Sequence, residues 1–305
     1  MKKKYGGFVD ESILKKNNNN FPDWFAINGR SSFDILIKFI KPKKIFIPYY
    51  ICKDLIDVIK FNKIKFEYYS INQKFNPKCN IILKKKEYAL IINYFGIENI
   101  TKTKKNHIYD LSLSFFNSTN KINFFFNSAR KFMHVGCGSF LSLKNFNKKI
   151  YSSTFRTKLS APKNYKEFKH NEKKQNIITK LFVNTYLDKN LIYQDLKKIQ
   201  NIRKRNYYFF YNHLKNINML KLKKRAHGPL YFPLLLKNGE KIRRLLNKKK
   251  IYTPILWKNL KRNKKFTFEY NLAKNCIFLP IDQRYNIKNI NYICANLIKI
   301  IENES

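Results

Sequence analysis

The chain has 305 residues, 44% hydrophobic and 16% aromatic, so it can bury a large core and is neither a disordered chain nor a small disulfide-stabilised scaffold. Its formal net charge of +44 comes from 63 Lys and Arg against 19 Asp and Glu, and these basic residues are spread along the whole sequence. Because the enriched Asn, Ile, Phe and Tyr share A/T-rich codons with Lys, coding bias explains the charge, and we do not expect nucleic acid as the partner.

Cysteines and histidines give no pattern typical of a metal site. The five cysteines form no CxxC pair and have no histidine at metal-ligand spacing, and the five histidines form no HxxxH or HxxE motif. The basic N-terminus is not followed by an apolar stretch, and no run of about 18 apolar residues could span a membrane. We therefore expect a soluble, cytoplasmic protein that uses neither a metal nor a membrane.

Short apolar runs alternate with helical spacing in the first half of the chain. The pattern predicts helices at 31–40 and 54–61, and strands at 45–47, 66–69, 88–93, 107–110, 124–126 and 139–143. Strands separated by helices indicate a parallel or mixed α/β sheet, in which ligands bind at the carboxyl ends of the strands.

The pattern changes near residue 165. Residues 167–213 are charged and have helical spacing. After them, the sequence predicts strands at 231–236, 252–256 and 276–279, and helices at 240–247 and 287–301. We predict three parts: a large α/β domain over 1–165, a helical linker region over 166–220 and a small α+β domain over 221–305.

The first candidate site is the run Asn28-Gly29-Arg30-Ser31-Ser32 at the start of a predicted helix. Backbone N–H groups and the helix dipole favour an anion there, and the two hydroxyls can hydrogen-bond a phosphate. A serine before a helix is also a common N-cap, so this run alone does not decide between the two roles.

The second candidate is Asp110, which ends an apolar strand and precedes the run Leu111-Ser112-Leu113-Ser114. A buried carboxylate needs a cation or several hydrogen-bond donors nearby. Strands also end in Asp simply because a turn begins, so both interpretations stay open for this residue taken alone.

The third candidate is Lys131, which lies three residues after Ser128 and next to Arg130, just beyond the apolar strand at 124–126. Burial and a neighbouring cation both lower the pKa of a lysine, so more of its amine is uncharged and able to attack a carbonyl. Most lysines in a chain this rich in lysine are solvated, so the order of the three candidates is more informative than any one of them.

Six short motifs follow one another along the chain. They are Asn28-Gly29-Arg30-Ser31-Ser32, Ile47-Pro48-Tyr49-Tyr50-Ile51-Cys52, Asn93-Tyr94-Phe95-Gly96-Ile97, Tyr109-Asp110, Ser128-Ala129-Arg130-Lys131-Phe132 and Leu279-Pro280-Ile281-Asp282-Gln283-Arg284-Tyr285. Their succession resembles the DegT/DnrJ/EryC1/StrS sugar aminotransferases, and most closely a shorter branch of that superfamily. The resemblance covers nearly the whole chain.

The resemblance implies the type I fold of pyridoxal-phosphate-dependent transferases, with a large α/β domain, a small α+β domain and a homodimer. It implies that Lys131 holds pyridoxal 5'-phosphate as a Schiff base and acts as general acid and base, and that Asp110 bonds the pyridine nitrogen. Tyr50 is our candidate for a contact to the ring. The phosphate would be bound by three hydroxyls, those of Ser31, Ser32 and Ser128.

By this resemblance we expect amino transfer from an amino acid, glutamate in the simplest case, to a nucleotide-linked keto-sugar for a surface polysaccharide. Three departures keep alternatives open: Leu113 replaces a Gln or His, Cys137 replaces an Asp, and no Gly-x-Asn-x-Arg segment occurs in 152–165. The alternatives are another pyridoxal-phosphate reaction on a sugar and a catalytically degenerate protein with a binding or regulatory role. Lys131 favours transamination over dehydration, because dehydrating relatives replace this lysine by histidine.

Overall fold

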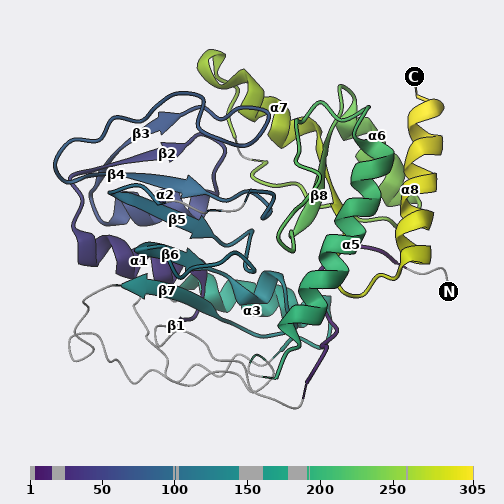
Figure 1. The fold of residues 1–305 in the computed structure, drawn as a ribbon, viewed down its shortest axis with the longest axis horizontal. Helices are drawn as coiled ribbons and strands as arrows, with labels where there is room; N and C mark the ends of the chain where they lie inside the picture. Colours follow the sequence, from purple (N-terminus) through teal and green to yellow (C-terminus); the bar gives the residue numbers. More distant parts are fainter. Residues whose placement is uncertain are drawn as a thin grey trace.

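The computed structural model describes residues 4–15, 25–98, 100, 103–143, 161–177, 191, 193–258 and 260–304. Figure 1 shows two units side by side: a seven-stranded sheet with its helices, and a smaller unit that ends in the C-terminal helix. The long helix α5 (Leu196–Leu214) belongs with the smaller unit, because it packs against that unit's strand β8 and helix α8.

The large sheet has the strand order β1-β7-β6-β5-β4-β2-β3. Its strands are β1 (Phe25–Ala26), β2 (Lys44–Pro48), β3 (Lys65–Tyr69), β4 (Glu87–Ile92), β5 (His107–Leu111), β6 (Phe124–Asn127) and β7 (Ser139–Leu143). Strands β2 to β6 pair in parallel, whereas β7 and β1 extend one edge by antiparallel pairing. The carboxyl ends of the parallel strands therefore share one edge, and their arrowheads in Figure 1 point toward the smaller unit.

Two amphipathic helices pack on this sheet. Helix α1 (Gly29–Ile40) contacts β6 and β7, and helix α2 (Lys53–Phe61) contacts α1 and β3. Phe33, Leu36 and Ile37 recur at helical spacing in α1 and are buried, and each such side chain contributes about 1.5–3 kcal/mol relative to an exposed one. Burial of this stripe fixes where the N-terminus of α1 meets the sheet.

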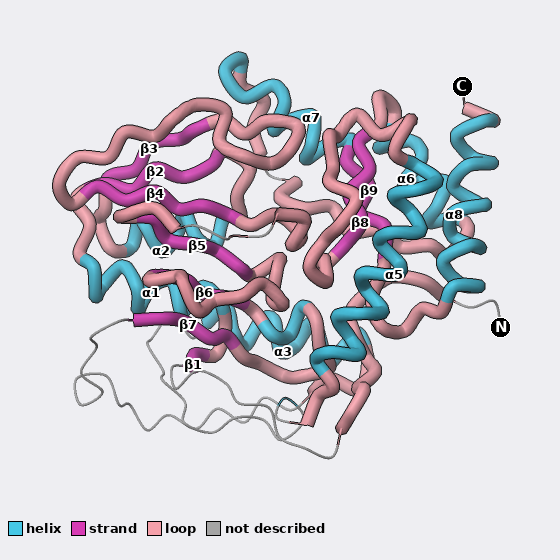
Figure 2. The backbone as a smooth tube through the Cα atoms, viewed as in Figure 1, coloured by secondary structure: helices cyan, strands magenta, loops and turns pink. Residues whose placement is uncertain are grey.

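The smaller unit is built around one antiparallel pair of strands, β8 (Tyr231–Leu235) and β9 (Cys276–Pro280). Its helices are α6 (Gly239–Lys248), α7 (Thr267–Asn275) and α8 (Ile287–Glu302), and Figure 2 shows α5, α6 and α8 together on one side of the pair. Between the two units in sequence lies helix α3 (Tyr165–Ile177).

One hydrophobic core runs through both units. The Tyr50 ring lies 4.3 Å, centroid to centroid, from that of Trp257, and the rings of Phe95 and Phe278 are 5.1 Å apart. In each pair the first residue follows a strand of the large sheet and the second belongs to the smaller unit. The predicted division at 1–165, 166–220 and 221–305 stays a prediction about chain organisation.

The N-terminal segment lies against the smaller unit. Tyr5 forms an isolated bridge to Ile251, and the Tyr252 N–H donates to the Tyr5 carbonyl at 2.8 Å. Within the described residues, no helix combines the length and apolar character needed to cross a membrane.

Most predicted elements are confirmed to within one or two residues, but the strand predicted at 252–256 is wrong. The described chain there has no strand, since Pro254 has no N–H to donate to a ladder and the only pairing is the bridge to Tyr5. Helix α7 was not predicted. The helical spacing predicted over 167–213 is confirmed in α3 and α5, and its middle part, 178–190, lies outside the described residues.

Candidate functional site

The N-terminus of α1 meets the carboxyl ends of β5 and β6. Gly29 is the closest point, because a Cβ there would lie 2.9 Å from Ser112 Oγ and 3.2 Å from the Asn127 carbonyl oxygen. A larger residue would push the helix away from the strand ends. The three segments predicted as candidate sites thus lie together at one edge of the sheet.

Asp110 lies near the end of β5 with its side chain buried. Its Oδ1 accepts a hydrogen bond from the Ser112 N–H at 2.7 Å. Burial raises the pKa of Asp110, while the charge of Lys131 and the hydrogen bonds from Ser112 lower it. A carboxylate that keeps acceptor positions open at a strand end is suited to bond a cationic N–H group.

Lys131 closes the short 3-10 helix η1 (Ala129–Lys131), which begins right after β6. Burial lowers the pKa of Lys131, the negative charge of Asp110 raises it, and the positive charge of Arg130 lowers it. Lys131 Nζ has no hydrogen-bond or ion-pair partner within the part of the chain that the structure describes. The amine is therefore a nucleophile with a depressed pKa beside a carboxylate.

Cys52 is a member of this cluster that the sequence did not single out. It is the half-buried N-cap residue of α2, and its pKa is raised by burial and by Asp54, and also responds to the charges of Lys131 and Asp110. No local signal marks it, because its position depends on how α2 packs against the sheet.

Tyr50 lies outside the cluster, although it is only two residues from Cys52. Its ring is fully buried against Trp257 and Tyr94, and burial and the charge of Cys276 raise the pKa of its hydroxyl. The side chain thus packs in the core between the two units, and the ring contact of Tyr50 stays a prediction.

The three predicted phosphate-binding serines have different environments. Ser31 N–H and Ser31 Oγ both donate to Asn28 Oδ1, at 2.9 and 3.1 Å, at the start of α1. Ser128 has a buried side chain with no hydrogen-bond partner within the described residues. Ser31 lies in the first turn of α1 and Ser128 directly follows β6, so both lie at the carboxyl edge of the sheet.

Ser32 is instead engaged inside the fold. Its Oγ lies 2.6 Å from Ser139 Oγ, which in turn donates to the Asn127 carbonyl at 2.6 Å, and Ser32 has no exposed surface. Because Ser139 uses its own proton on Asn127, Ser32 is the donor to Ser139. The phosphate prediction accordingly rests on Ser31 and Ser128.

Two of the three departures in sequence, Leu113 and Cys137, are buried side chains. Leu113 is 3% exposed and belongs to the main core, and Cys137 packs with Ile27 in a small cluster of its own. Asn93, which follows β4, donates its N–H to the Asp110 carbonyl at 3.0 Å, and its buried Oδ1 has no hydrogen-bond partner among the described residues. The described residues contain no group of three or more His, Cys, Asp and Glu side chains that could hold a metal ion.

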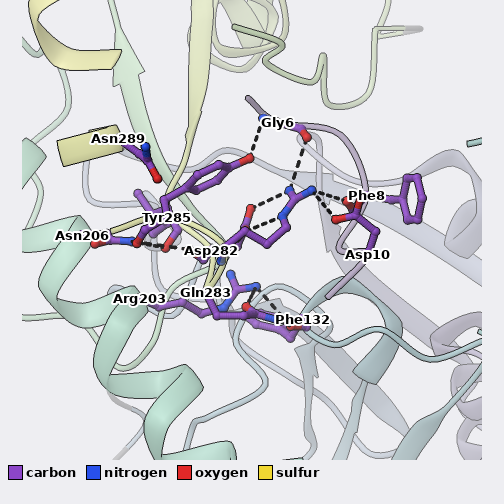
Figure 3. Close-up of polar contacts among 12 residues, drawn as sticks. Gly6, Phe8, Asp10, Phe132, Arg203, Asn206, Asp282, Gln283, Tyr285 and Asn289 are labelled. Carbon is purple, nitrogen blue, oxygen red and sulfur yellow. Dashed lines mark hydrogen bonds and ion pairs between the residues drawn. The ribbon is translucent and has the colours of Figure 1, made fainter. Parts of the chain in front are cut away.

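The peptide after Lys131 is anchored by side chains from far along the chain. The Phe132 carbonyl accepts from Arg203 in α5 at 3.2 Å and from Gln283 Nε2 at 2.8 Å, and Arg203 also donates to Gln283 Oε1 at 2.9 Å (Figure 3). The Arg203 guanidinium lies 4.9 Å from the centre of the Phe132 ring. This network fixes the backbone that carries Lys131, and sequence reasoning missed it.

The same β9–α8 connection also binds the N-terminal segment. Arg284 donates to both carboxylate oxygens of Asp282, at 2.7 and 2.9 Å, to the Phe8 carbonyl at 2.7 Å and to Asp10 at 3.0 Å (Figure 3). Such a bidentate pair is shorter and stronger than a neutral hydrogen bond. This polar junction therefore ties the N-terminal segment to the β9–α8 connection, whose Gln283 also holds the Phe132 carbonyl.

No family model matches the chain, and no curated protein does. Solved structures do match. Spr1654 from Streptococcus pneumoniae in its PLP-form is 11% identical, with a TM-score of 0.63 over 97% of this chain and 99% of that one. A DegT DnrJ EryC1 StrS aminotransferase from Brucella abortus is 10% identical, with a TM-score of 0.62 over 90% of this chain and 85% of that one.

A third match is the sugar aminotransferase CalS13 from Micromonospora echinospora, which is 8% identical, with a TM-score of 0.59 over 90% of this chain and 86% of that one. The matches span both units of the structure. They confirm the fold class predicted from the order of the motifs. The chain has the fold of the DegT/DnrJ/EryC1/StrS sugar aminotransferases.

Proposed function

We propose that the chain is a pyridoxal-phosphate-dependent aminotransferase that acts on a keto-sugar, with Lys131 as the residue that holds the cofactor. The observation that carries the proposal is geometric: Asp110 lies near the end of β5 and Lys131 follows β6, its parallel neighbour, at the carboxyl edge of a sheet with the fold of sugar aminotransferases. Nothing in the general composition of the chain favours this lysine over the others.

The residues at the edge fit the cofactor. Asp110 has open acceptor positions for the pyridine N–H and, as an anion, would keep that nitrogen protonated. Ser128 and the N-terminus of α1 at Ser31 offer donors for the phosphate, where the helix dipole also favours negative charge. Asn93 Oδ1 is a further buried acceptor without a partner.

Bound pyridoxal phosphate supplies an electron sink that makes the Cα–H of an amino acid acidic. With the cofactor bound, the amine of Lys131 would take the proton from Cα and release it two atoms away, on the far side of the amino nitrogen, which is the 1,3-proton shift of amino transfer. The lowered pKa leaves more of the amine uncharged and able to accept this proton. Arg203 and Gln283 hold the backbone that positions Lys131.

For the substrates, we propose glutamate as amino donor and a nucleotide-linked keto-sugar as acceptor, in the synthesis of a surface polysaccharide by a cytoplasmic homodimer. The supporting facts are the names of the structural neighbours, which include sugar aminotransferases, and the order of the motifs.

A second candidate function is binding without catalysis. Leu113 favours it, since a buried apolar side chain fills the position where related enzymes would place a polar contact to the cofactor. A third candidate, another cofactor-dependent reaction on a sugar, is less favoured because Lys131 is present.

The test is the first half of amino transfer. Protein loaded with pyridoxal phosphate is mixed with glutamate, and the cofactor absorbance band and 2-oxoglutarate are followed. We expect loss of the band and one equivalent of 2-oxoglutarate per site, and none from the Lys131→Ala variant. A loaded protein that leaves the band unchanged with every amino acid would be a binding protein, and the proposal of amino transfer would be wrong.

A further inference from the structure

A cavity of about 760 Å³ opens beside α5. Two segments form it, one turn of α5 and the loop that precedes β8. Its lining is Lys204, Arg205, Tyr208, Lys224, Arg225, Ala226 and His227. We call it the α5 pocket.

The α5 pocket is lined by four permanent cations and no carboxylate. Within the described part of the chain, Lys204, Lys224 and Arg225 form no ion pair. Arg205 donates only to Asn206 Oδ1 and to the Tyr285 carbonyl, and its Nη2 lies 2.9 Å from each of these oxygens. Four like charges around one hollow repel one another, and an anion inside it relieves this repulsion.

Arginine is much rarer than lysine in this chain. The chain has ten arginines among its 63 basic residues, and two of the ten, Arg205 and Arg225, line this one pocket. Arginine presents a planar fork of donors that matches phosphate oxygens, and the contacts to Asn206 and Tyr285 hold the fork of Arg205 in place.

Tyr208 adds an aromatic surface to the cations. Its side chain is 43% exposed, and Lys224 Nζ lies 5.5 Å from the ring centre. Hydrogen bonding to Asn212 and the charge of Lys224 lower the pKa of the hydroxyl. An exposed ring beside phosphate-binding cations is a surface on which a nucleobase can stack.

The loop of the α5 pocket also touches the strand edge of the site. The His227 N–H donates to the Gly96 carbonyl, just beyond β4, at 2.8 Å. On the other wall, Lys204 is adjacent to Arg203, which holds the Phe132 carbonyl. One wall of the pocket is thus hydrogen-bonded to the segment after β4, and the other lies next to the residue that holds the Phe132 carbonyl.

We infer that the α5 pocket binds the phosphate groups of a nucleoside diphosphate, with its lysines and arginines on the phosphates and Tyr208 against the base. The inference stands on the pocket itself. If the proposed function is also correct, the pocket is where the nucleotide part of the keto-sugar substrate binds.

Titration calorimetry of the full chain with UDP, ADP and inorganic pyrophosphate tests this inference. We expect saturable binding of all three, and a loss of at least about tenfold in affinity in Lys224→Glu/Arg225→Glu. The matched control is Lys85→Glu/Lys248→Glu, which changes the net charge equally at exposed lysines outside the pocket and should stay within about twofold. Tyr208→Leu should weaken both nucleotides more than pyrophosphate.

Equal losses in the two double variants would mean that overall surface charge attracts the anions, and the inference would be overturned. Absence of saturable binding to any of the three probes would also overturn it. Attachment of pyridoxal phosphate to Lys131 is measured on the same preparations. If pyridoxal phosphate attaches to Lys131 and the pocket binds none of the three probes, only the pocket inference fails. If the pocket binds the probes and pyridoxal phosphate does not attach, only the proposed function is contradicted.

Discussion

The carboxyl edge of the large sheet and the β9–α8 junction are both buried and polar, but they use their polar groups differently. At the junction, Arg203 donates to the carbonyls of Pro229, Leu230 and Phe132 and to Gln283. At the sheet edge, the Lys131 amine has no hydrogen-bond partner among the described residues.

This difference separates structural from functional polar groups. A buried donor or acceptor without a partner costs folding free energy, so other parts of the fold must offset the cost of such groups at the sheet edge. These unpaired groups are available to bind a ligand. The junction does the reverse, since its hydrogen bonds tie α5, the Lys131 loop and the N-terminal segment together. Substitutions in the two regions should therefore separate activity from stability.

The largest effect is expected for Asp110→Asn. The amide keeps an acceptor for the Ser112 N–H, so the free energy of unfolding should change by less than about 1 kcal/mol. Without the carboxylate the cofactor nitrogen is no longer held protonated, and kcat should fall by at least about 100-fold. Steady-state kinetics and urea titration measure the two quantities, and a stable variant with unchanged kcat would exclude Asp110 from the site.

Arg203→Leu should show the opposite result. The variant leaves the buried Pro229 and Leu230 carbonyls without this donor, which should lower the free energy of unfolding by about 2–4 kcal/mol. The control is Arg244→Leu, because that arginine forms an exposed, solvent-screened ion pair with Glu240 and its loss should change stability little. Equal losses in the two variants, measured in urea, would show that the junction does not hold the fold.

The serines sharpen the comparison within the edge itself. Ser128→Ala should weaken the affinity for pyridoxal phosphate by about tenfold with little change in stability, because its hydroxyl is kept for a ligand. Ser32→Ala should lower the free energy of unfolding by about 1 kcal/mol and leave cofactor affinity unchanged, since Ser32 is bonded to Ser139. The reverse pattern, in cofactor titrations and urea curves, would mean that Ser32 rather than Ser128 holds the phosphate.

The smallest effect concerns pH. The positive charge of Arg130 lowers the pKa of Lys131, so Arg130→Gln should raise that pKa and shift the rate profile of cofactor attachment to higher pH. Asp110→Asn should shift the profile to lower pH, because the carboxylate raises the pKa of the lysine. Shifts of the same sign in both variants would contradict the charge interactions described for this lysine.

Local patterns in the sequence were sufficient to predict most of the large sheet and α1, and the order of the motifs predicted that Asp110 and Lys131 would meet. Parallel strands make this possible, since residues after successive strands share an edge. The burial of Tyr50 in the core and the position of Cys52 beside Lys131 and Asp110 could not be predicted, because both depend on which way each side chain turns between two packed units.

Arg203 shows the same limit for charge. Its position in a basic helix indicates a solvated side chain, yet it is fully buried and bonded to carbonyls contributed by residues 132, 229 and 230. Those partners come from segments that no local spacing connects to α5. The pairing of distant segments is thus the part of the site that only the fold reveals.

The central claim is that Lys131 holds the cofactor, and reductive trapping tests it most directly. Protein mixed with pyridoxal phosphate is reduced with borohydride, digested and mapped by mass spectrometry, with Lys131→Ala treated in parallel. We predict one pyridoxyl group per chain, on Lys131, and no stoichiometric labelling of the variant. Labelling spread over surface lysines, or a variant that is labelled as fully as the wild type, would contradict the account.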